Sequence, residues 1–554
     1  MYSPLGELLF CILAVLLLCP PAMAQKPRGV RQTGVGTAEQ QFEQGLTALP
    51  RDAARAAEAF RAAIRMRPEM AAAHNGLALA LIALRQADQA ELSFREALRL
   101  RPAYPEAMVN LGLLLQGKGN VRDAIALFRQ AIDLQSDFAG AHNALGFALG
   151  QTGDMASAVA AFETATRLRP AYHEAWFRLG VTRWFAGQYD TAIAPLRKAV
   201  ALDAKHYESS YYLGVCLHKT GALPEAITEL RRAVRLGPRI PDGFLALGAA
   251  LYADELPDQA ISALQTAIRL KPDSIEAHNQ LGLAHIQNRD AAAAVAAFET
   301  ARRLDPNHAV TLNNLGLALI QKADYAGAVT IYRQALALNA DNAEAWYNLG
   351  VALKYRDDFP GAITALERSI ALQPSLHEAH YTLGVTLMQQ GKTGEAIQAF
   401  RNAVNAKPDF AEALYTLGTT LQQTGDTDAA IVAFREAIRI SPLSPQIHTT
   451  LGNALRQKGD LEAARAELQE GARLNRLKAA NQAAMFDTNT GIQKMKAGNL
   501  AAAIRFFASA IQKDPTHAPA HYQLGLALRK QGKSQAATAA FQRAHELDRR
   551  FKEE

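Results

Sequence analysis

Residues 343–350 read Ala-Glu-Ala-Trp-Tyr-Asn-Leu-Gly, and the Leu-Gly pair that ends this stretch returns at a fixed interval. The pair stands at 111–112, 145–146, 179–180, 213–214, 247–248, 281–282, 315–316, 349–350, 383–384, 417–418 and 451–452, so every step is 34 residues. Self-similarity at such a period indicates one supersecondary unit repeated along the chain.

The register extends beyond these copies in both directions. Counting from residue 37 gives thirteen units through residue 478, a short insertion at 479–483, two further units at 484–517 and 518–551, and a tail at 552–554. We therefore expect fifteen small units, and not the three or four globular domains that a chain of 554 residues suggests at about 150 residues each.

Within a unit, apolar or small residues stand at positions 4, 7, 8 and 11, which is one face of a helix. Position 20 is Ala in all fifteen units, position 24 is Phe, Tyr or Leu, and position 27 is Ala except at Ser369 and Gly471. Gly at position 15, as in Gly119 and Gly425, suits a left-handed turn after the first helix, and Pro at position 32, as in Pro170, ends the second. The pattern predicts an all-α fold built from closely packed helix pairs.

This pattern resembles the tetratricopeptide repeat (TPR) family, whose consensus first helix is close to residues 343–350. The resemblance covers residues 37–551. It implies a right-handed superhelical solenoid of about fifteen stacked helix-turn-helix units, with first helices lining a concave groove and second helices outside. Stacking is also required physically, because one helix pair cannot bury its apolar face alone.

We expect function in the groove, where positions 5, 6, 12 and 13 point away from the packing face. Amide side chains bind both donors and acceptors of an extended backbone, and exposed aromatic rings in successive repeats make interaction hot spots. The candidate partner-binding residues are Asn110, Phe177, Trp184, Phe185, Tyr211, Tyr252, Asn313, Asn314, Tyr347, Asn348, Tyr355, Tyr381 and Tyr415. Family members commonly carry Tyr at 5 and Asn at 6, so ligand contact and family background are equal alternatives.

One ligand class of the family is not supported. Its clamp for a C-terminal carboxylate needs Lys or Arg at positions 2, 5 and 6. Here position 2 is mostly acidic, position 5 holds no base and position 6 holds only Arg178. The acidic row itself is typical of helix N-termini, which favour negative charge.

The sequence predicts no catalytic site, no metal and no cofactor. The motifs HExxH, GxxxxGK[ST], CxxCH and GxSxG are all absent. His377 and His380 have the spacing of a metal pair, but position 4 holds His in several units, so we interpret them as packing residues. Cys216 fills a position held elsewhere by Ala or Thr and is interpreted as a small buried residue. The repeats leave no stretch of domain size, so a hydrolase or transferase is the disfavoured alternative.

Residues 1–24 are predicted to be a secretory signal peptide. The run from Leu8 to Leu18 is apolar and uncharged, and an A-x-A triplet at 22–24 provides a cleavage site before Gln25. The run is too short to span a bilayer as a helix. An uncleaved N-terminal anchor is the alternative, because no Lys or Arg precedes the run. Residues 25–36 are interpreted as a flexible leader, and the mature chain is expected in a periplasm or outside the cell.

Two irregularities interrupt the array. Pro195 lies inside the second helix of the fifth unit and is predicted to kink it. The insertion lies in a proline-free stretch from Glu462 to Lys496, which predicts one lengthened helix. No polar capping helix follows the last unit, so we expect an apolar end available for self-association through the C-terminal end.

These features favour an exported, non-catalytic scaffold that binds extended peptide or protein segments in its concave groove. The alternative is a structural or docking subunit of a cell-envelope secretion or surface-assembly complex, which would use its ends and convex face. A net charge of +6 over 554 residues, with Arg interleaved by Glu, predicts no nucleic-acid partner. No segment after the signal is long and apolar enough to predict a membrane helix.

Overall fold

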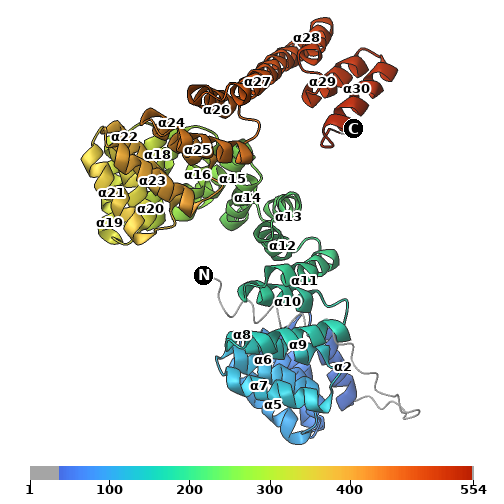
Figure 1. Ribbon diagram of the computed structural model, residues 1–554. Helices are drawn as coiled ribbons and strands as arrows, with labels where there is room; N and C mark the ends of the chain where they lie inside the picture. The colour runs from blue at the N-terminus through green and yellow to red at the C-terminus, as the bar shows by residue number, and fades with distance from the viewer. Residues whose placement is uncertain (1–36, 552–554) are drawn as a thin grey trace. The chain divides into compact units, whose positions relative to one another are not determined.

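The computed structural model describes residues 37–551, so the predicted signal peptide, the leader and the last three residues lie outside the described residues. Every regular element in the described range is an α-helix (Figure 1). The helices are α2 (Ala38–Ala48), α3 (Ala53–Met66), α4 (Ala71–Ala83), α5 (Ala87–Leu100), α6 (Pro105–Gly117), α7 (Val121–Leu134), α8 (Ala139–Gln151), α9 (Met155–Leu168), α10 (His173–Phe185), α11 (Tyr189–Leu202), α12 (Tyr207–Lys219), α13 (Leu223–Leu236), α14 (Pro241–Ala253), α15 (Pro257–Leu270), α16 (Ile275–Gln287), α17 (Ala291–Leu304), α18 (Ala309–Gln321), α19 (Tyr325–Leu338), α20 (Ala343–Tyr355), α21 (Phe359–Leu372), α22 (His377–Gln389), α23 (Thr393–Ala406), α24 (Ala411–Gln423), α25 (Thr427–Ile440), α26 (Pro445–Lys458), α27 (Leu461–Lys496), α28 (Leu500–Lys513), α29 (Ala518–Lys530) and α30 (Ser534–Leu547).

The helices pack in consecutive pairs, α2 with α3, α4 with α5, and so on to α24 with α25. First helices keep the 34-residue period, beginning for example at Ala309, Ala343, His377 and Ala411. Because α27 serves two units, the 29 helices of the described range make fifteen hairpins. The predicted all-α repeat fold is confirmed, and the right-handed course of the superhelix stays a prediction. The chain divides into two compact parts, one ending at Leu304 and one beginning at Asp305.

The two helices of a hairpin approach closely because small residues of each face a large residue of the other. Position-20 alanines such as Ala56 and Ala430 are fully buried, and so are position-24 rings such as Phe128 and Phe298. A Cβ atom added to Gly282 at position 8 would lie 2.5 Å from Phe298 Cε1, well inside van der Waals contact. The ring therefore fills the space that the absent side chain of glycine leaves.

The turn between the two helices of a unit uses left-handed backbone at position 15. Nine glycines have positive φ there, for example Gly425 at 89°. The same conformation is adopted at position 15 by Arg85, Glu255, Arg289, Ala323 and Asp357, with φ between 58° and 62°. Left-handed backbone costs a residue with a Cβ about 1 kcal/mol or more. The packing of the helices therefore holds this turn even where the local residue disfavours it.

Helix α11 continues through Pro195 because another helix satisfies the backbone group that proline leaves unpaired. Proline has no N–H to donate to the carbonyl of Thr191, four residues earlier. Nη1 of Arg183, on α10, lies 2.8 Å from that carbonyl oxygen and donates in its place. The other terminal nitrogen of Arg183 pairs with Glu163 on α9. The kink at Pro195 stays a prediction.

The lengthened helix is present as α27, which runs unbroken over 36 residues. Its N-terminal half packs with α26 and its C-terminal half with α28. At a regular boundary, position 3 of one unit packs near position 27 of the unit before, as Ala175 does near Ala165. On α27 the corresponding residues, Phe486 and Gly471, are separated by about 22 Å of continuous helix and cannot meet. Phe486 is consequently 70% exposed.

The end of the last unit is less apolar than predicted. The Phe551 ring packs on Tyr522 with centroids 5.3 Å apart, and Tyr522 packs on Phe541 at 5.5 Å. Between Phe486 and Phe551, no large hydrophobic side chain is exposed. Self-association through the C-terminal end stays a prediction, without an exposed apolar surface in the last described unit to support it.

Replacing Gly282 by Ala should lower the midpoint of thermal unfolding, because the added methyl group collides with the Phe298 ring. Overpacking of this kind costs about 1–3 kcal/mol. Gly150→Ala is the matched control, since Gly150 also lies in a first helix but a Cβ there meets nothing within 4 Å. That control should raise the midpoint slightly, because Ala favours helix over Gly by about 1 kcal/mol. Equal midpoints for the two variants would contradict the packing argument.

Candidate functional site

Within each compact part, the first helices of successive units lie against one another. Helix α6 contacts α8, α10 contacts α12 and α20 contacts α22, whereas successive second helices of the described chain touch far less. Hollows lie on the second-helix side instead, one between α3 and α5 and another between α11 and α13. The stack is therefore tighter along the first helices. Their positions 2, 5, 6, 12 and 13 form what we call the first-helix surface.

Tyrosine hydroxyls join successive first helices in the second part. The hydrogen-bonded pairs are Tyr347 with Thr382, Tyr381 with Thr416, and Tyr415 with Thr450. Each pair joins position 5 of one unit to position 6 of the next. The Oη–Oγ1 distance is 3.3 Å for Tyr381 and 3.4 Å for Tyr415. These predicted site residues therefore hold neighbouring repeats together.

Amide side chains make equivalent bonds in both parts. Asn110 Nδ2 donates to Asn75 Oδ1 at 3.1 Å, which again joins positions 5 and 6. Positions 12 and 13 are joined by Gln116 with Gln151 at 2.7 Å and by Gln422 with Gln457 at 3.1 Å. Asn313, Asn314 and Asn348 are half-buried, and Asn313 Oδ1 is buried without a hydrogen-bond partner. For the bonded amides and tyrosines, the structural role accounts for the residue type.

Aromatic rings gather between α10 and α12. The rings in this α10–α12 aromatic cluster are His173, Phe177, Trp184, Phe185, His206, Tyr207, Tyr211 and Tyr212. The Trp184 ring lies 4.8 Å from Phe185 and 5.0 Å from Tyr212. Phe185 is 65% exposed, so the cluster reaches the surface.

Sequence reasoning found four of these eight rings. It missed His173 and Tyr207 at position 1, which lie one helical turn before position 5, and Tyr212, which follows Tyr211 directly. It also missed His206, which is the last residue of the fifth unit and lies directly before α12. Tyr252 makes no ring contact in the described residues, although it packs against the same apolar core as Tyr211.

The second group of predicted aromatic residues does not form a cluster. Tyr355 stacks on Tyr325 at 4.9 Å, Tyr381 contacts Phe400 and Phe410, and Tyr415 contacts Phe434. Tyr347, Tyr355, Tyr381 and Tyr415 make no ring contact with one another in the described chain. Tyr381 and Tyr415 instead pack on rings of second helices, and their hydroxyl groups bond position 6 of the next unit. Tyr355, at 52%, is the most exposed of the four.

The first-helix surface combines neutral rings with carboxylates. Burial raises the pKa of Tyr211 to about 12, with Asp242 adding to the effect. Burial lowers the pKa of His173, and His206 beside it adds to that shift. Of the acidic residues at position 2, only Glu174 forms an ion pair with Lys or Arg in the described chain, through Arg178. The others are Glu106, Glu208, Asp242, Glu276, Glu344, Glu378 and Glu412.

The histidines at position 4 are structural. His380 Nε2 lies 3.0 Å from the carbonyl oxygen of Pro374, six residues earlier. The same contact is made by His74, His142, His278, His448 and His521, and Trp176 and Trp346 donate their indole N–H to the equivalent carbonyl. In eight of the fifteen units, position 4 therefore carries a side chain whose ring nitrogen contacts this carbonyl. His380 Nε2 is engaged by this carbonyl, which agrees with the interpretation of His380 as a packing residue.

Other chemistry finds little support in residues 37–551. Burial raises the pKa of Cys216 to about 12, so the thiol stays protonated at neutral pH. No three potential metal-binding side chains come together in this range. Likewise, none of its helices is both long and apolar enough to cross a membrane.

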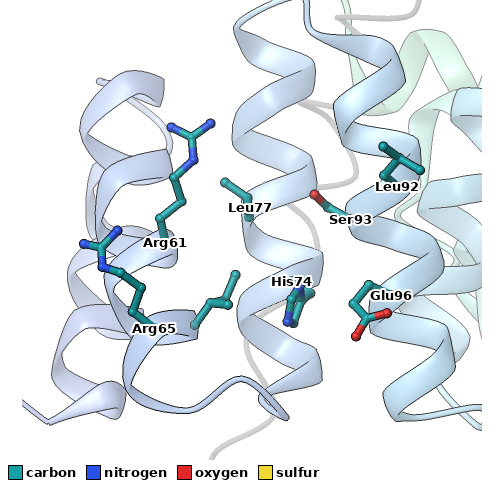
Figure 2. Close-up of a pocket in the computed structure, with 8 residues that line it drawn as sticks. Arg61, Arg65, His74, Leu77, Leu92, Ser93 and Glu96 are labelled. Carbon is teal, nitrogen blue, oxygen red and sulfur yellow. The ribbon is translucent and has the colours of Figure 1, made fainter.

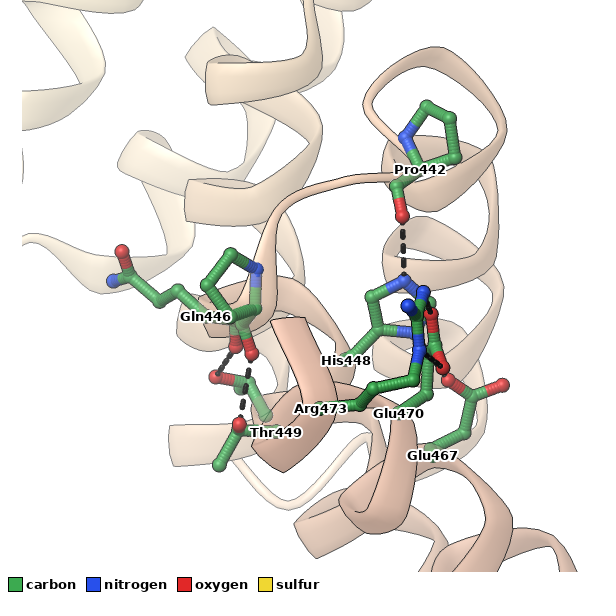
Figure 3. A network of polar contacts seen from close by, with 9 residues as sticks. Pro442, Gln446, His448, Thr449, Glu467, Glu470 and Arg473 are labelled. Carbon is green, nitrogen blue, oxygen red and sulfur yellow. Dashed lines mark hydrogen bonds and ion pairs between the residues drawn. The ribbon is translucent and has the colours of Figure 1, made fainter. Parts of the chain in front are cut away.

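His448 makes one contact more than the other position-4 histidines (Figure 3). Its Nε2 lies 2.9 Å from the Pro442 carbonyl oxygen, and its Nδ1 lies 2.6 Å from Glu467 Oε2, on α27. Both partners are acceptors, so the ring satisfies both only as an imidazolium. Burial opposes the charge, but the bonds to Glu467 and Pro442 outweigh it and raise the pKa of His448.

The fold and this surface define a helical-repeat scaffold of the kind that binds other proteins. The family model described as tetratricopeptide repeat matches residues 51–105, 109–173, 144–204, 177–239, 245–309 and 415–484. Further TPR models match residues 318–355, 386–425, 494–552 and 343–376. The first model alone covers more than half of the chain, so this chain belongs to the tetratricopeptide repeat family.

Three solved structures are similar to parts of this chain. A crystal structure of YrrB, described as a TPR protein with an unusual peptide-binding site, is 25% identical over 33% of this chain and 95% of its own, with a TM-score of 0.32. A crystal structure of MamA is 29% identical over 29% of this chain and 95% of its own, with a TM-score of 0.28. MamA from Desulfovibrio magneticus RS-1 is 24% identical over 31% of this chain and 96% of its own, with a TM-score of 0.30. No curated protein matches the chain.

Replacing Glu467 by Gln should destabilise the protein more at low pH than at high pH. The pKa of His448 is raised above its unfolded value of about 6.5. The stabilisation is therefore complete below about pH 6.5 and is lost as the pH rises through the folded pKa. The gap between the urea midpoints of wild type and Glu467→Gln should shrink over that rise.

Glu436→Gln is the matched control, because Glu436 pairs with Arg439, which stays charged at every pH used. The difference between the urea midpoints of wild type and Glu436→Gln should stay constant over the same pH range. A constant gap for Glu467→Gln as well would show that His448 is not held as an imidazolium.

Proposed function

We propose that this chain is an exported, non-catalytic scaffold that binds extended peptide or protein segments along its first-helix surface. The α10–α12 aromatic cluster carries the proposal. Large aromatic side chains that reach solvent beside buried ones are typical binding hot spots. Phe185 is mostly exposed, and Trp184 next to it has a buried Nε1 with no acceptor. Family membership supports the interaction role in general, because TPR arrays are interaction scaffolds.

The binding track in this proposal consists of position 13 within each compact part. Phe185 occupies this position in the first part and Tyr355 in the second, and both are exposed by more than half. The tyrosines at position 5 contribute less, because their hydroxyl groups are bonded to the next repeat. Substitutions at the two kinds of position therefore separate ligand contact from structural support.

Affinity capture from a cell-envelope extract with residues 25–554 tests the proposal. A Phe185→Ser/Tyr355→Ser variant should capture at least about tenfold less of the partner that wild type captures, which corresponds to about 1.4 kcal/mol. Tyr381→Phe is the matched control: it removes the two bonds of the hydroxyl group to Glu412 and Thr416 of the next repeat and keeps the ring, so capture should be unchanged. Equal capture by wild type and the double variant would refute the track and favour the docking-subunit alternative.

Export is part of the proposal and rests on residues 1–24. N-terminal sequencing of the protein purified from its native cell should give a chain that begins at Gln25. A chain that begins at Met1 in the membrane fraction would instead establish the N-terminal anchor.

A further inference from the structure

A hollow of about 430 Å³ lies between the second helices α3 and α5, with α4 beneath it (Figure 2). Ile64 and Leu77 make its floor apolar. Arg61 and Arg65, one helical turn apart on α3, line one wall, and Leu92 on α5 lines the other. This α3–α5 hollow is on the opposite side of the hairpins from the first-helix surface.

The comparable hollow between α11 and α13 is braced by ion pairs. Arg197, at position 25 of its unit, reaches across to Glu225, and Arg232 pairs with Glu229. Arg61 also stands at position 25. In the described residues, however, neither Arg61 nor Arg65 forms an ion pair or a side-chain hydrogen bond.

The one carboxylate among the described residues that line the hollow, Glu96, already forms an ion pair with another residue. Glu96 lines the α5 wall, but Arg99 donates to its two oxygens at 2.8 and 2.7 Å. Arg61 and Arg65 therefore add two positive charges to the wall of the hollow, and no ion pair of the described residues neutralises them.

Leu92 is a second, independent feature. It stands at position 22, where most units carry Ala, Thr or Ser, such as Ala126 and Ser262; Val432 is the other aliphatic exception. Leu92 is 69% exposed. A small residue would serve the packing of α5 equally well, so Leu92 adds apolar surface to the wall that faces the two arginines.

We propose that the α3–α5 hollow docks an acidic amphipathic helix of a partner protein. The groove between two helices accepts the ridge of a third helix, whose aliphatic side chains would cover Leu77 and Leu92. Carboxylates four residues apart on that helix match the one-turn spacing of Arg61 and Arg65, and guanidinium groups bind carboxylates with paired hydrogen bonds. A nucleic-acid backbone would engage the arginines but leave Leu92 uncovered, so the apolar wall favours a protein.

Helix-constrained peptides displayed on phage provide the test. The library is first depleted on an Arg61→Glu/Arg65→Glu/Leu92→Ser variant of residues 25–554, which removes binders of every other surface. The remaining clones are then selected on the unaltered chain. Survivors should carry aliphatic residues on one helix face with Asp or Glu at i and i+4. A representative peptide should bind the unaltered chain at least about tenfold more tightly than the variant.

Matched variants make the outcome decisive. Arg231→Glu/Arg235→Glu changes the same two positions of another unit and should bind the selected peptide like the unaltered chain. A peptide with Lys in place of its acidic residues should prefer Arg61→Glu/Arg65→Glu. Circular dichroism verifies that each variant is folded. If the triple variant is unfolded, Leu92→Ser alone replaces it, and we then expect a smaller loss of affinity for the selected peptide.

Three results would overturn the proposal. One is that no clone survives depletion, and another is that survivors lack acidic residues. The third is that a DNA duplex of about 20 base pairs binds the Arg61→Glu/Arg65→Glu variant more weakly than the unaltered chain, while every peptide binds both equally. That result would assign the arginines to a nucleic acid. Loss of the first-helix track would leave this test unaffected, because the two surfaces are on opposite sides of the hairpins.

Discussion

The contact between glycine at position 8 and the large side chain at position 24 is the constraint on which thirteen of the fifteen hairpins depend. It sets how closely two helices approach, and the buried alanines at positions 20 and 27 are small for the same reason. A ring such as Phe298 occupies the volume that the missing side chain of Gly282 leaves, and Leu264 and Tyr332 fill the same volume beside Gly248 and Gly316. Once the hairpin has this geometry, its apolar faces are exposed until a neighbour stacks on them.

Stacking also explains why polar residues recur at fixed positions: they form hydrogen bonds between neighbouring units, although a recurring polar residue can look like a ligand-binding residue. A histidine at position 4 donates to a carbonyl at the end of the preceding unit, and tyrosine or asparagine at position 5 bonds position 6 of the next unit. Such residues recur at the repeat spacing for a packing reason. In a repeat protein, recurrence of a polar residue is therefore weak evidence for a ligand, and a departure from the repeat pattern is stronger evidence.

The two proposed surfaces rest on departures of this kind. Phe185 and Tyr355 place large exposed rings at position 13, and Leu92 places an exposed aliphatic side chain at position 22. Beside Leu92, Arg61 and Arg65 add two positive charges without an ion pair among the described residues, as Arg333 and Arg401 at position 25 of other units also do. Fold alone does not select a partner for a TPR array. These residues instead indicate the chemistry of the partner: apolar or aromatic groups that contact the first-helix surface, and carboxylates with aliphatic side chains that contact the α3–α5 hollow.

The 34-residue pattern alone established the period, the number of hairpins, the left-handed turn where position 15 is glycine, and the long helix α27. All of these follow from local spacing and backbone preference, which nearly every repeat shows again. Helix packing, and not the repeat pattern, brings His206 and Tyr212 into the α10–α12 aromatic cluster and Arg183 to the carbonyl that Pro195 leaves free. It also keeps Tyr347, Tyr381 and Tyr415 apart and leaves Arg61 without an ion pair in the described chain. Those facts depend on which side chains of neighbouring units come within contact distance. Helix stacking sets that distance, and it produces no repeating residue pattern from which the contacts could be predicted.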